Sequence, residues 1–246
     1  MNYGQDIKRY YNEESTQYSH KRYEGVTDTY VKYFFKLRLA LVLQFLSDLA
    51  SRALSGRSGR SSLLEVGTAD GVVLREIVRK LPNKFKQLVG VDIAAKMIGE
   101  ARALTSDKKI SFFEISQVPA EKFDAILFVG FMTEALWQEY QPFIREHLDS
   151  GGYVIISLAG AGSLHARFKL AQAPYVADYR SYGRYRQVLS QDFQILAEKH
   201  YGLFIPKLWA WPALARLIQP LVDRFLVPFL PNLFHECLYL VRSNSR

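Results

Sequence analysis

Cysteine is almost absent from this sequence. Among its 246 residues, Cys237 is the only one. A single cysteine excludes an intrachain disulfide framework and argues against a cysteine-based metal site. We therefore expect a fold that is held together by an apolar core, in a reducing compartment such as the cytoplasm.

Long apolar runs are also missing. No run of about 18 uncharged apolar residues occurs, so the sequence predicts no helix that spans a bilayer. The N-terminal stretch MNYGQDIKRYYNEESTQYSHKRYEG is polar and lacks the apolar centre of a signal peptide. A cytoplasmic protein is the expectation, and a peripheral contact with a membrane surface is left open.

Acidic residues are outnumbered, which gives the chain a formal net charge of +8. Residues 1–60 carry +4 and residues 151–246 carry +6, whereas residues 61–150 carry −2. Nucleic acid, an anionic membrane surface or a phosphorylated substrate would each be attracted to such basic flanks. Basic side chains on solvated faces are the simpler interpretation, and no nucleic-acid partner is expected.

A Gly/Ser-rich stretch, SGRSGRSS at residues 55–62, separates a long helical pattern from an alternating one. Upstream, residues 27–54 place apolar side chains at helical spacing. Downstream, five apolar runs alternate with helical patterns at residues 71–81, 95–104 and 132–148. The five strands predicted from these runs are Ser62–Val66, Gln87–Asp92, Ile110–Glu114, Phe123–Gly130 and Gly152–Leu158.

This alternation predicts a parallel sheet with helices on both faces, because its strands are too apolar to be half exposed. The stretch HLDSGG, residues 147–152, predicts a turn before the fifth strand. Two later strands are predicted at Phe193–Tyr201 and Phe234–Val241. The fold class is therefore α/β, with residues 1–60 as a helical N-terminal segment and residues 61–246 as the main domain.

The first predicted strand ends in an acid and a turn of small residues, Glu65-x-Gly67-x-Ala69-x-Gly71. Such a turn between a strand and a helix presents backbone N–H groups and the positive end of the helix dipole to a ligand. It differs from the dinucleotide fingerprint, which needs a small residue where Val72 stands. Glu65 would repel a pyrophosphate and suits a ligand with cationic or hydrogen-bond-donating groups.

Two further acids end the next two strands. Asp92 can accept hydrogen bonds from both hydroxyls of a ribose, although a plain helix N-cap is the alternative. Glu114 is either a ligand contact or a solvated charge at a strand end. The order and spacing of these features over residues 62–158 resemble the class I S-adenosylmethionine-dependent methyltransferases of the small-molecule and lipid type. Ala69 stands where that family usually has its middle glycine.

The resemblance implies a Rossmann-like sheet of seven strands, mostly parallel with an antiparallel last strand, and S-adenosylmethionine as the cofactor. It places Glu65 near the amino group of the methionine part and Glu114 at the adenine amino group. Ile93 and Met97 are expected to line the adenine pocket. The full set of expected cofactor-binding residues is Tyr18, Glu65, Gly67, Thr68, Ala69, Gly71, Asp92, Ile93, Met97, Glu114, Ile115, Val129 and Gly130.

No general base is obvious in the sequence. The fourth strand ends in FVGF, residues 128–131, which is not the Asp/Asn-Pro-Pro-aromatic motif of enzymes that methylate amino groups on nucleobases. It also lacks the acids of metal-dependent relatives, so no metal is expected. His165 follows the fifth strand and is the candidate catalytic residue, because a neutral imidazole can take a hydroxyl proton. A surface histidine that opens a helix is the alternative.

The N-terminal stretch YYNEESTQYSHKRYE resembles the opening segment of small-molecule and lipid methyltransferases, which folds over the cofactor. The resemblance implies that Tyr11, Tyr18 and Tyr23 close the site. Tyr18 or Arg22 would then contact the methionine carboxylate. An exposed helix with amphipathic tyrosines is the alternative.

An insertion at residues 202–232 stands where the family usually has a short hairpin. Pro212 suits a helix start, and Pro220 should kink the helix. We expect a roof over the acceptor site or an interfacial anchor; dimer packing or an enlarged core is the alternative. On a helical wheel the apolar face consists of Leu214, Leu217, Ile218, Leu221, Val222, Phe225 and Leu226, and the polar face of Arg216, Gln219, Asp223 and Arg224.

These features predict a methyltransferase that acts on a small, apolar or lipid-linked acceptor, with oxygen as the expected acceptor atom. The absence of an obvious base keeps open a second hypothesis, a cofactor-binding but non-catalytic partner subunit. The basic flanks motivate a third, an RNA or protein methyltransferase. An oligomer is left open.

Overall fold

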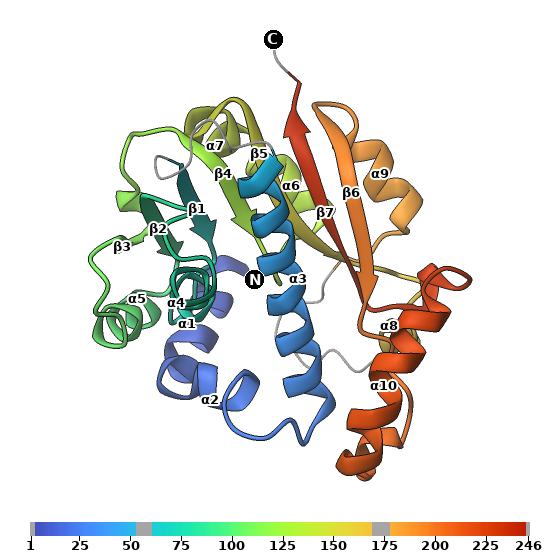
Figure 1. The fold of residues 1–246 in the computed structure, drawn as a ribbon. Helices are drawn as coiled ribbons and strands as arrows, with labels where there is room; N and C mark the ends of the chain where they lie inside the picture. The colour runs from blue at the N-terminus through green and yellow to red at the C-terminus, as the bar shows by residue number, and fades with distance from the viewer. Residues whose placement is uncertain (1–2, 53–60, 169–177, 245–246) are drawn as a thin grey trace.

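The computed structural model describes residues 3–52, 61–168 and 178–244, and its centre is a seven-stranded sheet (Figure 1). The strands lie in the order β3-β2-β1-β4-β5-β7-β6. Neighbours from β3 to β5 are parallel, and β7 runs antiparallel to both β5 and β6, so the predicted Rossmann-like sheet with an antiparallel last strand is confirmed. The strands are β1 (Ser62–Val66), β2 (Gln87–Asp92), β3 (Ile110–Glu114), β4 (Phe123–Phe128), β5 (Leu148–Ala159), β6 (Phe193–Tyr201) and β7 (Glu236–Ser243).

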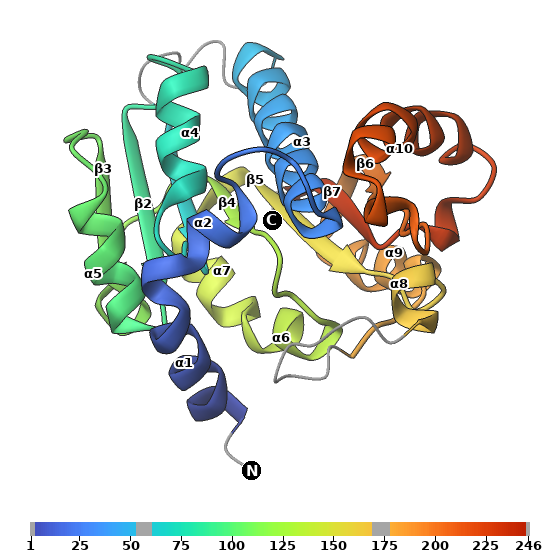
Figure 2. The same cartoon turned by 90° about the horizontal axis from the view of Figure 1, so that it is seen from below.

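Helices cover both faces of this sheet (Figures 1 and 2). One layer consists of α3 (Tyr30–Arg52), α4 (Val72–Lys80) and α5 (Ala95–Ala103), and the other of α6 (Glu134–Glu139), α7 (Gln141–His147) and α9 (Tyr182–Leu189). Successive side chains of a strand point to opposite faces of the sheet. Leu63 packs in the core beneath α3 and α4, and Leu64 packs in the core beneath α6 and α9. Two buried faces explain why β1 is apolar without alternation.

Further elements lie at the carboxyl ends of the parallel strands (Figure 2). The N-terminal segment and the insertion stand at opposite sides of this carboxyl edge, with α8 beside the insertion. The elements are α1 (Tyr3–Glu14), η1 (Ser15–Gln17), α2 (Tyr18–Arg22), η3 (Ile115–Gln117), α8 (Leu164–Arg167), η4 (Leu208–Ala210), α10 (Pro212–Leu226) and η5 (Pro231–Leu233). In open α/β sheets, ligands bind at this edge.

Two local predictions need correction, and a third falls mostly outside the described residues. The helix expected over residues 132–148 is two helices, and Pro142 lies in the first turn of the second. The turn expected at residues 147–152 belongs to β5, which begins at Leu148 and carries an irregular register there. Gly151 has a positive φ of 65°, so it bends the strand without ending it. Most of the Gly/Ser-rich stretch, residues 55–60, lies outside the described residues.

Within the described ranges, none of the helices combines the length and the apolar character that crossing a bilayer requires.

Candidate active site at the carboxyl edge

The glycine turn follows β1 next to β4, where the strand order of the sheet reverses. Gly67, Ala69 and Gly71 all have positive φ values, of 74°, 50° and 77°. Backbone N–H groups of Gly67 and Thr68 donate to the carbonyl of Val91 at 2.8 and 3.0 Å, which fixes the turn to the end of β2. Glycine is favoured in this left-handed conformation because it has no side chain. Ala69 adopts it at a steric cost.

Asp92 holds the same turn from the neighbouring strand. Its carboxylate accepts hydrogen bonds from the backbone N–H groups of Ala69 and Ala94, both at 2.9 Å. The side chain is buried, and burial raises the pKa of Asp92 above its ordinary value. Carboxylate oxygens can accept more than one hydrogen bond each, so acceptor capacity for ribose hydroxyls remains. The alternative role of Asp92 as a helix N-cap is wrong, because Ala94 is the N-cap residue of α5 and no side chain caps that helix.

Glu65 is a second buried carboxyl group beneath the turn. Its Oε2 accepts a hydrogen bond from Thr68 Oγ1 at 2.7 Å. Burial raises the pKa of Glu65 to about 8. A nearby cation would restore the charge of this group, which makes Glu65 a suitable partner for a cationic ligand.

The N-terminal segment covers the turn. Tyr11 and Tyr18 pack against a small apolar floor made by Ala69, Ala94 and Met97. Ser19 connects the two elements, since both its backbone N–H and its hydroxyl donate to the carboxylate of Asp70. The expected closure of the site by Tyr11, Tyr18 and Tyr23 stays a prediction.

The remaining predicted cofactor residues lie around this floor. Glu114 ends β3 opposite Asp92 and approaches Lys8 of α1 at 3.9 Å. Ile115 begins η3 and is partly buried, as is Ile93. Val129 and Gly130 follow β4, and the backbone N–H of Gly130 donates to Ser157 Oγ at 2.8 Å. The structure thus brings the predicted residues to the ends of adjacent strands.

Arg22 is paired on one side of its guanidinium only. Its Nη2 pairs with Glu14 at 2.6 Å, and the guanidinium lies over the ring of Tyr18 at 4.3 Å. Its Nη1 is buried without a hydrogen-bond partner, so the contact of Arg22 with a methionine carboxylate stays a prediction.

Arg38 is a site residue that the sequence did not reveal. It lies on α3, is buried, and sits close to Gly130: a Cβ added there would meet its Nη1 at 2.5 Å. Its Nη1 lies 3.5 Å from Glu236 Oε1, and the Tyr201 hydroxyl donates to the same carboxylate. An arginine in the helical stretch FFKLRLALVL is normally interpreted as a solvent-exposed position, so no signal in the sequence indicated that Arg38 is buried.

His165 lies on α8 and contacts a second histidine, His235, with ring centroids 3.8 Å apart. Burial lowers the pKa of His165 to about 3, and burial does the same to His235. The imidazole is therefore neutral, as expected for a proton acceptor, but such a low pKa makes it a weak base at neutral pH. The surface histidine considered as the alternative is wrong, since this ring is partly buried.

A row of aromatic rings, here called the aromatic row, connects the glycine turn to α8. Neighbouring ring centroids lie between 5.2 and 6.5 Å apart. The row consists of Tyr11, Tyr18, Tyr23, Phe35, Phe34, Tyr30, Phe204 and Phe168. Its rings pack on one another beside Arg38, and Phe34 belongs to the buried core.

One group of side chains bears on the expectation that no metal is bound. Glu198, His200 and Cys237 bring a carboxylate oxygen, a ring nitrogen and a sulfur within 4.8 Å of one another. The Glu198 carboxylate already accepts two hydrogen bonds from Arg186, and burial raises the pKa of the Cys237 thiol. Sequence reasoning considered Cys237 alone and missed this grouping, whose other members come from β6.

The residues at the turn fit the cofactor expected from the sequence. Asp92 offers acceptors for ribose hydroxyls, Glu65 suits a cationic amino group, and Ala69 belongs to a small apolar floor. A cavity of about 470 Å³ lies elsewhere, between α1 and α5, and none of the predicted cofactor residues lines it. Tyr11 and Tyr18 instead pack directly on the floor.

Comparison with known proteins gives one family and many structures of the same fold. Residues 34–203 match the family described as methyltransferase domain. An S-adenosylmethionine-dependent methyltransferase from Mesorhizobium loti is 17% identical with a TM-score of 0.53, over 80% of this chain and 100% of that one. The plantazolicin methyltransferase BpumL in complex with SAH is 15% identical with a TM-score of 0.53, over 97% and 96% of the two chains.

A putative methyltransferase in complex with the Haloferax volcanii Trm112 methyltransferase activator is also similar. It is 14% identical with a TM-score of 0.55, over 85% of this chain and 97% of that one. Comparison with curated proteins gave no match. Identities this low show a shared fold only. The family match spans more than half of the sequence, and this protein therefore belongs to the methyltransferase-domain family as a class I S-adenosylmethionine-dependent methyltransferase.

Proposed function

We propose that this methyltransferase acts on a small acceptor that is apolar or lipid-linked, and that the acceptor atom is oxygen. The aromatic row carries this proposal. It runs from the glycine turn toward α8 and the insertion, along the edge where the methyl group is transferred in this fold. Aromatic side chains offer a large apolar contact area with few polar groups to satisfy, which suits an apolar substrate.

The described residues suggest how the cofactor is held. When bound, S-adenosylmethionine supplies an electrophilic methyl group on a sulfonium centre. Asp92 would accept from the ribose, Glu65 would face the amino end of the methionine part, and Glu114 would lie at the adenine. Because Tyr18 packs on the floor of this site, we expect the N-terminal segment to open for the cofactor to enter and then to close over it, with the hydrogen bonds from Ser19 to Asp70 formed again in the closed state.

Positioning and exclusion of water are the main catalytic contributions we expect from this chain. His165 is retained as a candidate residue near the acceptor, where its neutral ring can accept a hydrogen bond. Its low pKa argues against a large contribution as a base. An acceptor whose hydroxyl is already acidic, such as a phenol or a carboxylic acid, would suit this arrangement best.

Titration calorimetry with S-adenosylhomocysteine is the first test. Wild type should bind, and Asp92→Ala should bind at least about tenfold more weakly, because two ribose hydrogen bonds to a charged group are lost. Asp107→Ala is the matched control, since Asp107 likewise accepts from a backbone N–H, of Lys109, but precedes β3 at the opposite edge. Equal affinity in Asp92→Ala would contradict the assigned site.

The second candidate, a non-catalytic partner subunit, draws support from the weak base and from the Haloferax neighbour, which was solved with an activator. Size-exclusion chromatography and a pull-down from the native host separate the two candidates. A stoichiometric partner together with no turnover on phenolic and carboxylic lipids would favour the subunit. Turnover by the isolated chain would exclude it.

A further inference from the structure

The insertion helix α10 is oriented with its polar stripe inward. Ala215, Gln219 and Asp223, spaced four residues apart, are its buried side chains. Gln219 donates to the carbonyl of Leu203 at 2.7 Å and to Asp223 at 2.9 Å. The Tyr33 hydroxyl of α3 donates to the other oxygen of Asp223 at 2.7 Å.

These hydrogen bonds fix the rotation of the helix about its axis. Rolling α10 to bury its apolar face would carry Gln219 and Asp223 away from their partners. The Leu203 carbonyl, which is buried, would then lose its donor. The outward direction of the apolar face therefore follows from a satisfied polar network on the inner side.

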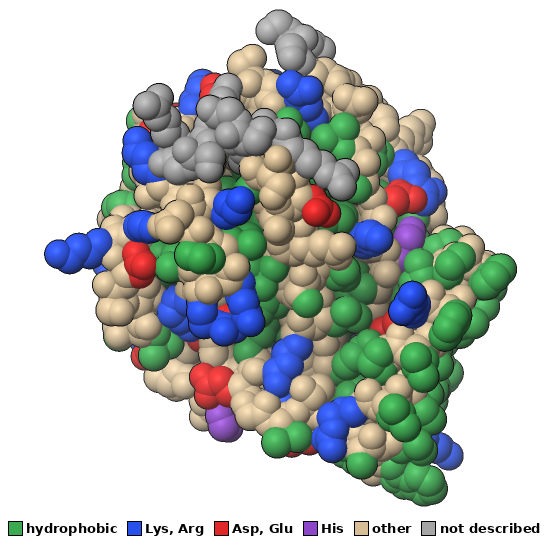
Figure 3. Space-filling model, in the orientation of Figure 1, with side chains coloured by type: hydrophobic (Ala, Val, Ile, Leu, Met, Phe, Trp, Pro, Cys, Tyr) green, Lys and Arg blue, Asp and Glu red, His purple; other side chains and the backbone are tan. Residues whose placement is uncertain are grey.

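The outer face of α10 and its flanks, here called the outer patch, is exposed and strongly apolar. Leu217, Phe225 and Phe229 are 68%, 64% and 78% exposed. Figure 3 shows the apolar side chains gathered over this helix. The large apolar side chains of the outer patch are Trp211, Leu214, Leu217, Leu221, Phe225, Phe229 and Leu230. The enlarged core that the sequence left open is wrong for this face. Contiguous patches of this kind mark interaction surfaces.

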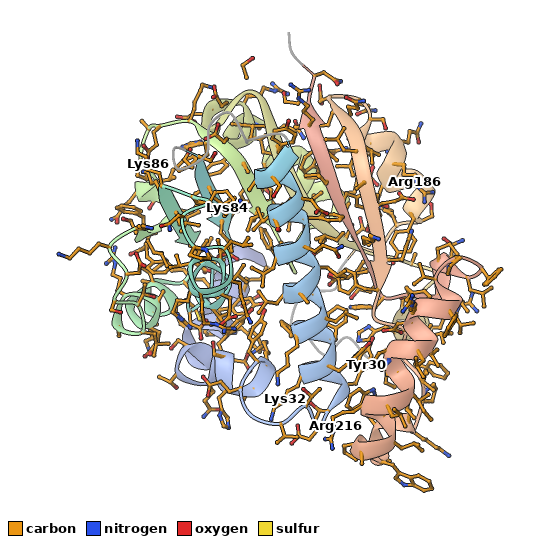
Figure 4. The ribbon with its side chains drawn as sticks, in the orientation of Figure 1. Tyr30, Lys32, Lys84, Lys86, Arg186 and Arg216 are labelled. Atoms are coloured by element: carbon orange, nitrogen blue, oxygen red, sulfur yellow. The ribbon has the colours of Figure 1, made fainter. Side chains whose placement is uncertain are left out.

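The exposed charged side chains of residues 202–232 all have one sign. Residues 202–232 contain three exposed basic side chains, Lys207, Arg216 and Arg224. Their single acidic side chain, Asp223, is buried and hydrogen-bonded. Arg216 lies on the side of α10 that faces α3, and Lys32 is a residue of α3 near the same end (Figure 4). The exposed charges of residues 202–232 are therefore all positive, whereas Lys32 is paired with the exposed Asp28 at 3.2 Å.

This charge pattern decides between two occupants. In a symmetric dimer the same patch meets itself, so the basic side chains of one copy would face those of the other. An anionic lipid surface is complementary to an apolar face with a basic rim. Trp211 at the start of the helix has the amphipathic ring that favours the headgroup region.

We propose that the outer patch of α10 docks this protein on an anionic membrane surface, with the helix lying in the plane of the interface. α10 lies at the carboxyl edge of the sheet, beside α8 and β6 (Figure 2), and the glycine turn follows β1 at the same edge. An acceptor dissolved in the membrane would then reach the site without crossing water. That last step rests on the proposed function, whereas the docking itself does not.

Vesicle flotation of the full chain, without cofactor or acceptor, tests the docking. Wild type should float with phosphatidylcholine vesicles that contain phosphatidylglycerol, and less with phosphatidylcholine alone. Leu217→Ser, Leu221→Ser and Phe225→Ser together should reduce the bound fraction about tenfold or more. These side chains are exposed, so circular dichroism and S-adenosylhomocysteine binding should remain unchanged.

Two further variants complete the test. Leu104→Ser with Leu196→Ser is the matched control, because both side chains are exposed, at 54% and 44%, but lie outside α10. This control should float like wild type. The second variant replaces three basic residues, Lys207, Arg216 and Arg224, with Gln. It should float equally with vesicles that contain phosphatidylglycerol and with vesicles of phosphatidylcholine alone.

Three outcomes would overturn the docking proposal. Wild type that stays at the bottom of the gradient would do so, as would a serine variant that floats unchanged. A concentration-dependent dimer that the serine variant loses, without vesicle binding by wild type, would assign the patch to a second copy instead. A protein that floats but methylates no lipid acceptor would contradict the proposed function and leave the docking intact.

Discussion

A carboxyl group buried as deeply as that of Glu65 does not carry its charge freely. Burial raises its pKa from 4.5 to about 8, so around neutral pH the folded protein holds a proton there that the unfolded chain releases. The stability that this proton contributes is fully present below about pH 4.5 and is lost as the pH rises through about 8. Glu65 is therefore both a ligand candidate and a pH-dependent element of stability.

We predict that Glu65→Gln flattens the alkaline part of the stability profile. The variant keeps an acceptor for Thr68 but has no proton to lose. Its free energy of unfolding, from urea titrations between pH 6 and pH 9, should decline less with pH than that of wild type. Parallel profiles for the two proteins would show that Glu65 is charged throughout this range.

A second prediction compares two glycines. Gly130 has a φ of 91° and a Cβ there would meet Arg38, whereas a Cβ at Gly99 of α5 would meet no atom within 4 Å. Gly130→Ala should lose about 1–3 kcal/mol of unfolding free energy, since it strains the backbone and displaces a buried cation. Gly99→Ala should gain about 0.4–1 kcal/mol because it stiffens the unfolded chain. Equal effects at the two positions would contradict the close approach of Arg38.

At the scale of elements, the sequence predicted the bounds of the strands well, but it predicted less well which face of a helix packs against the protein. The predicted bounds of β1, β2, β3 and β6 agree with the structure, because each strand is a short apolar run between polar turns. The helical wheel of α10 grouped its polar residues on one face, but the structure buries Gln219 and Asp223 and leaves Arg216 and Arg224 exposed, and the wheel could not tell which face is inward. That depends on acceptors and donors far away in the sequence, such as Leu203 and Tyr33. The burial of Arg38 was missed for the same reason.

The polar stripe of α10 leads to a prediction about its attachment. Gln219→Leu removes the donor to Leu203 and Asp223, so two buried acceptors lose a partner at a cost of about 1–3 kcal/mol. Amide hydrogen exchange should accelerate in α10 while β1 and β4 stay protected. Arg224→Gln, at an exposed position of the same helix, is the control and should exchange like wild type. Uniform acceleration over the whole chain would mean that α10 does not open by itself.

At the scale of the whole molecule, the N-terminal segment packs on the main domain at the glycine turn. Ser19 and Asp70 are 51 positions apart in the sequence and hydrogen-bonded in the fold. The prediction that the N-terminal segment folds over the cofactor depends on such contacts, which sequence patterns do not report.

Removing the Ser19 hydroxyl should therefore weaken cofactor binding from a distance. We predict that Ser19→Ala binds S-adenosylhomocysteine about fivefold more weakly, which corresponds to one hydrogen bond of about 1 kcal/mol. Thr29→Val is the control, because the Thr29 hydroxyl accepts only from Lys32 in an exposed turn. An unchanged affinity of Ser19→Ala in calorimetry would show that the segment does not close over the cofactor.

The sheet order has a consequence for how the chain assembles. β6 pairs only with β7, and β7 lies between β6 and β5, so the strand farthest along the sequence joins the other two. While the chain is being synthesised, β5 must present an unpaired edge until β7 arrives, and β6 has no sheet to join. Exposed edges of this kind invite pairing with other nascent chains. β7 is therefore the last strand to join the sheet, where it takes its place between β5 and β6. We expect the yield of folded protein in the cell to depend on chaperones that protect the β5 edge until β7 has been synthesised.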